Sequence, residues 1–178
     1  LMVGNGIPKL VERFSPADAR TPAQLAATLA QFTARYDAHK EDKTAPYPGI
    51  PALLDALKAE GIQCAVFSNK ADALCGGIIA HYFGTGRFDA VRGNRPGVPT
   101  KPDPTGLYAL MTELGADPAE AIAVEDSYNG IRAAHAAGMK PVMVPDILPP
   151  DDEMREKAVH ICRDLHEARE VIAKMLAQ

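Results

Sequence analysis

The sequence predicts an α/β protein with an open parallel β-sheet, and three observations support this prediction. Short apolar runs of strand length occur at 62–67, 121–124 and 141–144. Helical patterns of 10–14 residues alternate with these runs, which is typical of β-α-β units with parallel strands and right-handed crossovers. Polar residues follow the strand ends directly, where open parallel sheets bind their ligands.

Residues 1–46 have a different pattern, because they show helical spacing and no strand signal. Apolar residues recur at helical spacing over 7–14. A second helix is expected over 21–40, because Thr21-Pro22 reads as an N-cap followed by proline at the first helical position. We therefore expect a helical segment, 1–46, attached to an α/β domain, 47–178.

Within 47–178 the expected elements alternate between helices and strands. Helices are expected over 50–57, 71–83, 103–114, 127–137 and 164–176. Strands are expected over 62–67, 88–91, 121–124, 141–144 and 159–162.

The composition excludes several classes of partner. The 178 residues are 47% hydrophobic and 24% charged, which is ordinary for a globular protein of one domain, or of a core with a small appended domain. A net charge of −4 without a basic run argues against nucleic acid or an anionic membrane as the main partner. Three cysteines without metal-like spacing indicate reduced thiols. We expect a cytoplasmic monomer or homodimer.

An acidic pair, Glu125-Asp126, closes the apolar run 121–124. Two adjacent carboxylates at the end of a parallel strand can hold a hard cation such as Mg²⁺ through oxygen ligands. The alternative is that Asp126 or Ser127 only caps the following helix. Capping accounts for one of these residues but not for two acids, so we favour a magnesium site.

Two other segments carry polar groups suited to an anion. Ser68-Asn69-Lys70 follows a predicted strand and precedes a predicted helix, where side-chain donors and the helix dipole can bind an anion. The alternative is that Ser68 and Asn69 are helix caps and that Lys70 faces solvent. Lys101 lies in a proline-stiffened turn and can neutralise a phosphate as a point charge; the alternative is a solvated surface lysine.

The order of these three features resembles the haloacid dehalogenase (HAD) superfamily of phosphatases and phosphomutases. Within this superfamily, the chain resembles the phosphoglycolate phosphatases in four motifs. These are Val3-Gly4-Asn5-Gly6, Pro46-Tyr47-Pro48-Gly49, Ser68-Asn69-Lys70 and Gly97-Val98-Pro99-Thr100-Lys101-Pro102. The resemblance implies a Rossmann-like HAD core at 47–178 and a partial helical cap at 1–46.

The resemblance also implies roles for individual residues. Ser68, with Asn69 and Lys70, would bind the phosphoryl group, and Lys101 would bridge phosphate and nucleophile, so that Ser68 and Lys101 take part in catalysis. Glu125 and Asp126 would hold Mg²⁺. Asn5 would face the substrate from the cap.

Two features depart from the phosphoglycolate phosphatases. Their fourth motif is usually Gly-Asp-Ser, whereas Glu125-Asp126-Ser127 and the stretch 142–146 resemble the β-phosphoglucomutase branch. The first motif of the family, Asp-x-Asp-Gly-Thr, is absent, and it supplies the nucleophile and the general acid/base. We expect it upstream of Leu1, in a first core strand that this fragment lacks together with part of the cap.

In the family the first strand lies between the strands matching 62–67 and 121–124. Without it, we expect these two strands to expose unpaired edges or to pair directly. We also expect the 178 residues alone to be inactive, because the nucleophilic aspartate is absent.

The expected function is Mg²⁺-dependent hydrolysis of a small phosphorylated metabolite, 2-phosphoglycolate, through an aspartyl-phosphate whose nucleophile lies outside this chain. One alternative is a β-phosphoglucomutase-like sugar phosphomutase, favoured by Glu125-Asp126. Another is an inactive module that binds phosphate without turnover.

Overall fold

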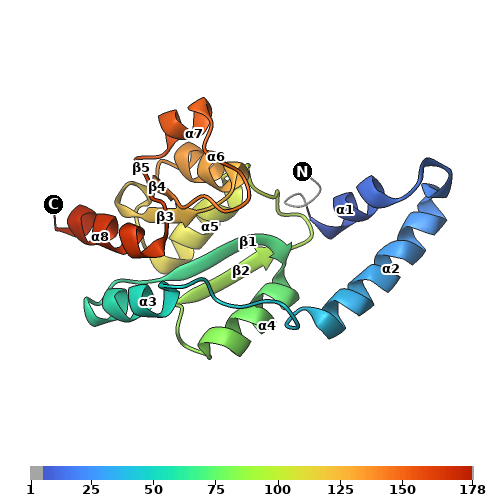
Figure 1. Ribbon diagram of the computed structural model, residues 1–178, viewed down its shortest axis with the longest axis horizontal. Coiled ribbons are helices and arrows are strands. Elements are labelled where there is room, and N and C mark those ends of the chain that lie inside the picture. Colours follow the sequence, from blue (N-terminus) through green and yellow to red (C-terminus); the bar gives the residue numbers. More distant parts are fainter. Residues whose placement is uncertain (1–5, 178) are drawn as a thin grey trace.

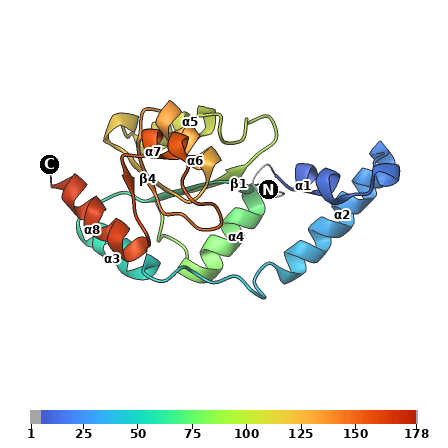
Figure 2. The ribbon, with the colours of Figure 1, turned by 45° about the horizontal axis from the view of Figure 1, so that its top comes forward.

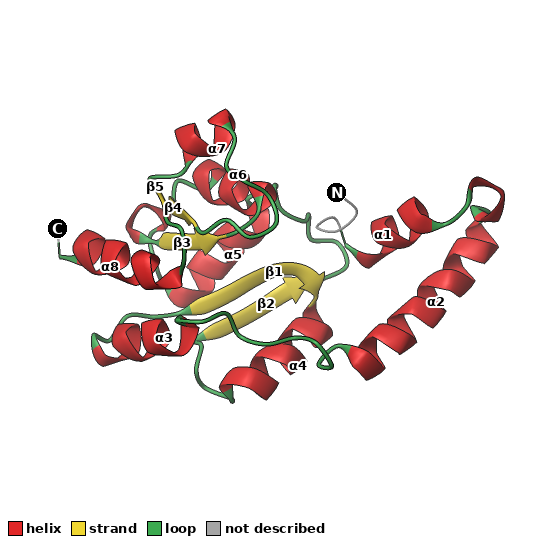
Figure 3. Cartoon of the chain, viewed as in Figure 1, coloured by secondary structure: helices red, strands yellow, loops and turns green. Residues whose placement is uncertain are grey.

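The structure, a computed structural model, describes residues 6–177 and contains parallel strands in two separate sheets (Figure 1). The first sheet pairs β1 (Ala65–Ala71) with β2 (Ala90–Asn94). The second has the order β3 (Ile122–Glu125), β4 (Lys140–Met143) and β5 (His160–Ile161). Figure 3 shows the strands of both sheets in yellow, surrounded by helices. The expected α/β class with parallel strands is confirmed.

The helices follow the order expected from the sequence, with the short helix α7 in addition. They are α1 (Ile7–Phe14), α2 (Pro22–His39), α3 (Ile50–Ala59), α4 (Asp72–Phe83), α5 (Thr105–Leu114), α6 (Tyr128–Ala136), α7 (Asp152–Lys157) and α8 (Leu165–Leu176). Two 3-10 turns, Ala17–Ala19 and Pro118–Glu120, lie between them. Within residues 6–177 no helix has both the length and the apolarity that crossing a bilayer requires.

The predicted start of the first strand was wrong by three residues. The ladder begins at Ala65, opposite Ala90, and not at residue 62. The reason is Asp89, whose carboxylate accepts from the backbone N–H of Cys64 at 2.8 Å, while its own N–H donates to the Cys64 carbonyl at 2.7 Å. A side chain therefore replaces the ladder partner just before the sheet begins.

The end of β1 also differs from the prediction, because residues 68–70 belong to the strand and do not form a loop after it. Phe67 lies opposite Arg92 and Ala71 lies opposite Asn94. Between these two pairs β1 therefore advances by four residues while β2 advances by two. Such a bulge re-aims side chains and interrupts regular pairing. The sheet therefore presents residues 68–70 from an irregular strand end.

The second sheet contains the most completely buried strand. Val142 and Met143 of β4 are fully buried, because β3 and β5 pair with both edges of this strand. Met143 packs with Ile131 of α6 and Met154 of α7, and Val142 packs with Cys162 and Ala168. This core gives the ends of β3 and α6 a rigid support.

The first sheet contacts both α4 and α5, and α5 is the helix that carries the Lys101 loop. Phe67 of β1 contacts Leu107 and Leu110 of that helix. A Cβ atom at Gly106 would lie only 2.2 Å from the Phe67 ring, so α5 can approach β1 this closely because residue 106 is glycine. The same helix starts just after Lys101, so its packing places the Lys101 loop near the end of β1.

The helices α1 and α2 lie to one side of both sheets (Figures 1 and 2). The 18-residue α2 has no buried residue, and α1 buries only Val11. The start of α2 is stabilised locally, because Thr21 and Gln24 form a reciprocal capping box. The predicted Thr21-Pro22 helix start is confirmed, whereas the division into 1–46 and 47–178 stays a prediction.

Candidate functional site

A pocket of about 560 Å³ lies where α1 and α2 face the carboxyl ends of β1 and β3. Six of the predicted site residues line it, namely Ser68, Asn69, Lys70, Lys101, Glu125 and Asp126. Asn5, the seventh, lies outside the described residues. Residues far apart in the sequence therefore meet at one place, as expected for groups at the carboxyl ends of parallel strands.

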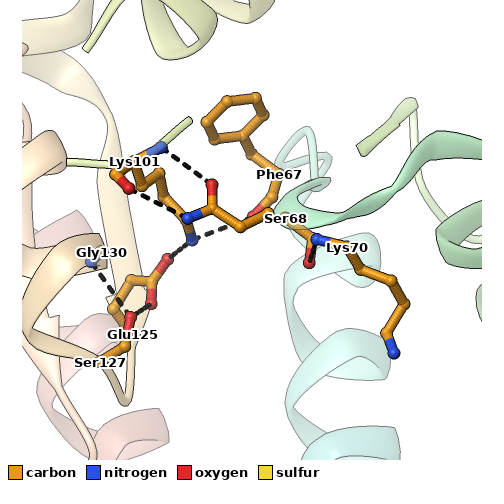
Figure 4. A network of polar contacts seen from close by, with 8 residues as sticks. Phe67, Ser68, Lys70, Lys101, Glu125, Ser127 and Gly130 are labelled. Atoms are coloured by element: carbon orange, nitrogen blue, oxygen red, sulfur yellow. Dashed lines mark hydrogen bonds and ion pairs between the residues drawn. The ribbon is translucent and has the colours of Figure 1, made fainter. Parts of the chain in front are cut away.

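Lys101 is the buried cation of this pocket, with 8% of its surface exposed. Its Nζ donates to the carbonyl of Phe67 at 3.2 Å and forms an ion pair with Glu125 (Figure 4). The ammonium thus lies between the ends of β1 and β3. The alternative of a solvated surface lysine is wrong.

Glu125 points back toward the start of α6 and away from solvent. Its carboxylate pairs with Lys101 and accepts from the Ser127 hydroxyl at 3.1 Å. A Cβ atom at Gly130 would lie 2.0 Å from Glu125 Oε2, so the carboxylate occupies the space that a side chain at residue 130 would need. Glycine at this position therefore permits the observed pairing of Glu125 with Lys101 (Figure 4).

Ser127 is the residue that caps α6, because its hydroxyl accepts from the backbone N–H of Gly130 at 3.1 Å. Asp126 is exposed, and its carboxylate makes no hydrogen bond or ion pair within residues 6–177. Asp126 therefore does not cap the helix. Its oxygens are the ones that can turn to a ligand in the pocket.

The oxygen donors at the end of β3 suit Mg²⁺, which typically takes one or two protein carboxylates and completes its octahedron with water and substrate oxygens. Among residues 6–177 no group of three or more His, Cys, Asp and Glu side chains is placed to hold a metal. The Asp126 carboxylate would therefore be the direct protein ligand. Glu125 would support it, or would bind directly after leaving Lys101.

At the end of β1 the three polar residues have three different partners. The Ser68 hydroxyl accepts from the N–H of Lys70 at 3.1 Å. The Asn69 carboxamide bonds to the backbone of Lys101. Neither Ser68 nor Asn69 caps α4, because the N-cap residue of α4 is Ala71. The capping alternative is therefore wrong.

Lys70 connects the sheet to the helical segment. Its Nζ donates to the Tyr36 hydroxyl at 2.5 Å and lies 4.7 Å from the centre of the Tyr36 ring. The ring of Phe32 stacks on Tyr36, and both rings line the pocket. The alternative of a lysine that merely faces solvent is wrong.

Sequence reasoning missed several pocket residues. Arg13 of α1 and Arg132 of α6 line the pocket, and Arg132 forms an ion pair with Glu153 of α7 that lowers the pKa of that carboxyl. Tyr36 lies on the apolar face of α2, where helical spacing predicts burial but no polar partner. Only the approach of α2 to β1 identifies it as a pocket residue.

Tyr47 lies beside the acidic strand ends and donates to Asp146 at 2.7 Å. This hydrogen bond, together with burial and the charges of Asp146 and Asp126, raises the pKa of Tyr47 to about 12. The phenol therefore stays protonated at neutral pH and acts as a hydrogen-bond donor.

Comparisons with known proteins agree with this geometry. The family model of haloacid dehalogenase-like hydrolases matches residues 2–138. The phosphoglycolate phosphatase of Caulobacter vibrioides is 34% identical over 146 residues, which cover 81% of this chain and 62% of that protein. The chain thus spans about three fifths of the length of this relative.

Solved structures share the same fold. A predicted phosphoglycolate phosphatase from Haemophilus somnus superposes with a TM-score of 0.85 at 26% identity, covering 96% of this chain and 79% of that one. The β-phosphoglucomutase of Clostridium difficile superposes with a TM-score of 0.77 at 20% identity, covering 96% and 75%, which shows likeness of fold alone. The chain belongs to the haloacid dehalogenase-like hydrolases and, among them, is similar to the phosphoglycolate phosphatases.

Proposed function

We propose that this chain forms most of a Mg²⁺-dependent phosphomonoester hydrolase that acts on a small phosphorylated metabolite, 2-phosphoglycolate. The observation that carries the proposal is the meeting of Ser68, Lys101 and Asp126 in one pocket. A hydroxyl donor, a buried ammonium and a carboxylate available to a cation are the groups that phosphoryl transfer requires. The choice of 2-phosphoglycolate is supported by the similarity to phosphoglycolate phosphatases.

Each residue has a role that follows from its surroundings. Lys101 neutralises charge on the phosphoryl oxygens, and the hydroxyl of Ser68 helps to orient the same group. Asp126, supported by Glu125, would hold Mg²⁺, which supplies further charge neutralisation when bound. Lys70 and Asn5 are the candidates for contacts to the rest of the substrate.

We further propose that the nucleophilic aspartate lies on a strand between β1 and β3, outside these 178 residues. Among the described strands, β1 pairs only with β2, and β3 pairs only with β4. Lys101 donates to the carbonyl of Phe67 on β1 and pairs with Glu125 at the end of β3. An aspartate at the end of an inserted strand would therefore lie beside Lys101. Residues 1–46 are then part of a cap over the core at 47–178.

The test is an assay of inorganic phosphate released from 2-phosphoglycolate with Mg²⁺. We expect no turnover from the chain alone. We expect turnover after the chain is joined to the segment that precedes the matched region in the Caulobacter relative. In the joined protein, Lys101→Ala and Asp126→Ala should each lower kcat by about 100-fold or more.

The matched control is Lys140→Ala, which removes an exposed lysine at the opposite end of the second sheet and should leave the rate unchanged. Full activity in Lys101→Ala or Asp126→Ala would refute the assigned roles. Turnover by the chain alone would refute the proposed position of the nucleophile.

A sugar phosphomutase is the second candidate, and Glu125 is the observation that favours it, because phosphoglycolate phosphatases usually have glycine at this point of the motif. The fold likeness to a β-phosphoglucomutase agrees with either activity. Dependence on a sugar bisphosphate activator, without release of inorganic phosphate, would identify the mutase. Binding of phosphate esters without turnover by the joined protein would identify an inactive module.

A further inference from the structure

We infer that the side chain of Asn69 is a positioning residue that holds Lys101 in place and does not itself bind the phosphate. The sequence predicts Asn69 as a phosphate-binding residue, so this inference changes its role. It rests on the proposed function insofar as Lys101 is taken to meet the phosphoryl group. The geometry behind it does not depend on that function.

The evidence is a reciprocal pair of hydrogen bonds between Asn69 and the backbone of Lys101, 32 residues further along the chain. Asn69 Oδ1 accepts from the Lys101 N–H at 2.8 Å, and Asn69 Nδ2 donates to the Lys101 carbonyl at 3.0 Å. Both contacts have good hydrogen-bond distances. The carboxamide therefore binds the peptide backbone on both sides of a single residue.

This pairing also determines which way the carboxamide faces. Rotating it by half a turn would place its NH₂ group against the Lys101 N–H and its oxygen against the Lys101 carbonyl. Both contacts would then be repulsive, because donor would face donor and acceptor would face acceptor. Only an asparagine-like amide in the observed orientation matches the two backbone groups.

The Lys101 backbone needs such a partner because it lies in a loop. Residues 95–104 connect β2 to α5 without a strand ladder. Asn69 lies on β1, whose neighbouring residue Phe67 packs against α5. The carboxamide therefore ties the loop to β1.

Holding the backbone of Lys101 matters because its side chain is long and flexible. The Nζ atom must meet the Phe67 carbonyl and Glu125 together. A displaced loop would move the ammonium away from both partners, and errors of about 1 Å in such a group can cost about 100-fold in rate. Asn69 thus influences phosphate binding only by holding Lys101 in position.

The first test measures hydrogen exchange of the Lys101 backbone amide by NMR in the full chain, without ligand. In Asn69→Ala this amide should exchange about tenfold faster, because its acceptor is gone. Asn94→Ala, which removes an asparagine from the end of the neighbouring strand β2, is the control and should leave Lys101 exchange unchanged. Unchanged exchange in Asn69→Ala would overturn the inference.

The second test measures binding of inorganic phosphate in the presence of Mg²⁺ for Asn69→Ala, Lys101→Ala and the double variant. If Asn69 acts through Lys101, Asn69→Ala should weaken binding roughly tenfold, and the double variant should bind no more weakly than Lys101→Ala. Additive losses would mean that Asn69 contacts the phosphate independently, which would overturn the inference.

A third variant covers the possibility that Asn69→Ala does not fold. Asn69→Asp keeps the acceptor for the Lys101 N–H but loses the donor to its carbonyl, so we expect a protected amide with weakened phosphate binding. If the Lys101 amide lost its protection from exchange while phosphate binding stayed unchanged, the inference would be contradicted. Absence of phosphate binding in the unaltered chain would count against the proposed function alone, because the exchange measurement still decides the role of Asn69.

Discussion

The neighbouring strands β3 and β4 belong to one sheet but lie in very different environments. Val142 of β4 is fully buried, whereas Val124 of β3 is 40% exposed. The cause is pairing, because β4 has a strand on each side and β3, within the described residues, has one. The candidate site residues that the structure describes lie on β1, on β3, directly after β3 and in the loop between β2 and α5, and none lies on β4. Stability is thus concentrated in the strand paired on both sides, and the candidate chemistry lies at strands with an unpaired edge.

The largest expected effect comes from making the same substitution, valine to alanine, on each of the two strands. Val142→Ala should lower the free energy of unfolding by about 2–3 kcal/mol, because it removes fully buried methyl groups and leaves a cavity. Val124→Ala should cost less than about 1 kcal/mol, because its side chain is partly in water. Urea denaturation of both variants measures the difference.

The same pair can test the proposed strand between β1 and β3. In the protein joined to the segment that precedes the matched region in the Caulobacter relative, Val124 should become buried, and Val124→Ala should then cost about as much as Val142→Ala. An unchanged, small cost in the joined protein would show that nothing covers this edge of β3.

The second prediction concerns the functional end of β3, which is tightly packed although its edge is exposed. Gly130→Ala should destabilise the protein by about 1–3 kcal/mol, because the new Cβ would overlap the Glu125 carboxylate. Gly76→Ala in α4 is the matched control, because no atom lies within 4 Å of its new Cβ. That control should stabilise the protein by about 0.5–1 kcal/mol.

A compensating change shows whether the overlap is the cause. Glu125→Asp withdraws the carboxylate by one methylene, so Gly130→Ala should cost less in the Glu125→Asp background than alone. Thermal melts of the four proteins form the cycle. An equal cost in both backgrounds would show that Glu125 is not the residue that meets the new methyl group.

The smallest effect is at the end of β1, where polar contacts rather than burial hold the chain. The backbone N–H of Gly93 donates to Asp72 at 2.7 Å, and this bond, followed by the contact with Arg95, lowers the pKa of Asp72 below its ordinary value of 3.8. A lowered pKa gives stability that is present above pH 3.8 and is lost as the pH falls toward the folded-state value.

Asp72→Asn should therefore be less stable than the unaltered protein at about pH 7, and the difference should shrink at about pH 3. Denaturant midpoints at the two pH values provide the measurement, and the cost of Val142→Ala at the same two values provides a reference without a titrating group. A constant difference for Asp72→Asn would show that the carboxylate charge contributes nothing to this contact.

Much of the fold could be predicted because helical and strand periodicity are local properties. The alternating order and the Thr21 helix start are confirmed. The starts of β1 and β2 were predicted too early, because the Asp89 side chain takes the place of the ladder partner of Cys64. A contact between residues 25 positions apart leaves no signal in either local pattern.

The site could be predicted as a set of residues but not as a set of contacts. Ser68, Lys101 and Asp126 were recognisable because each carries a suitable group beside a predicted strand or helix end. The pairing of Glu125 with Lys101 and the space left by Gly130 were not, because they depend on how closely α6, β3 and the Lys101 loop approach. Their roles in turnover stay predictions.

By itself, the sequence determined the α/β class, the order of the elements and the family, since these follow from periodicity and from short motifs at strand ends. Only the tertiary structure decided that Lys101 is buried between two strand ends, that Asn69 holds its backbone and that β1 and β3 do not pair. The physical reason is that burial and hydrogen bonding depend on the distances between segments that are far apart in the sequence. These distances result from tertiary packing and cannot be predicted from a local sequence pattern.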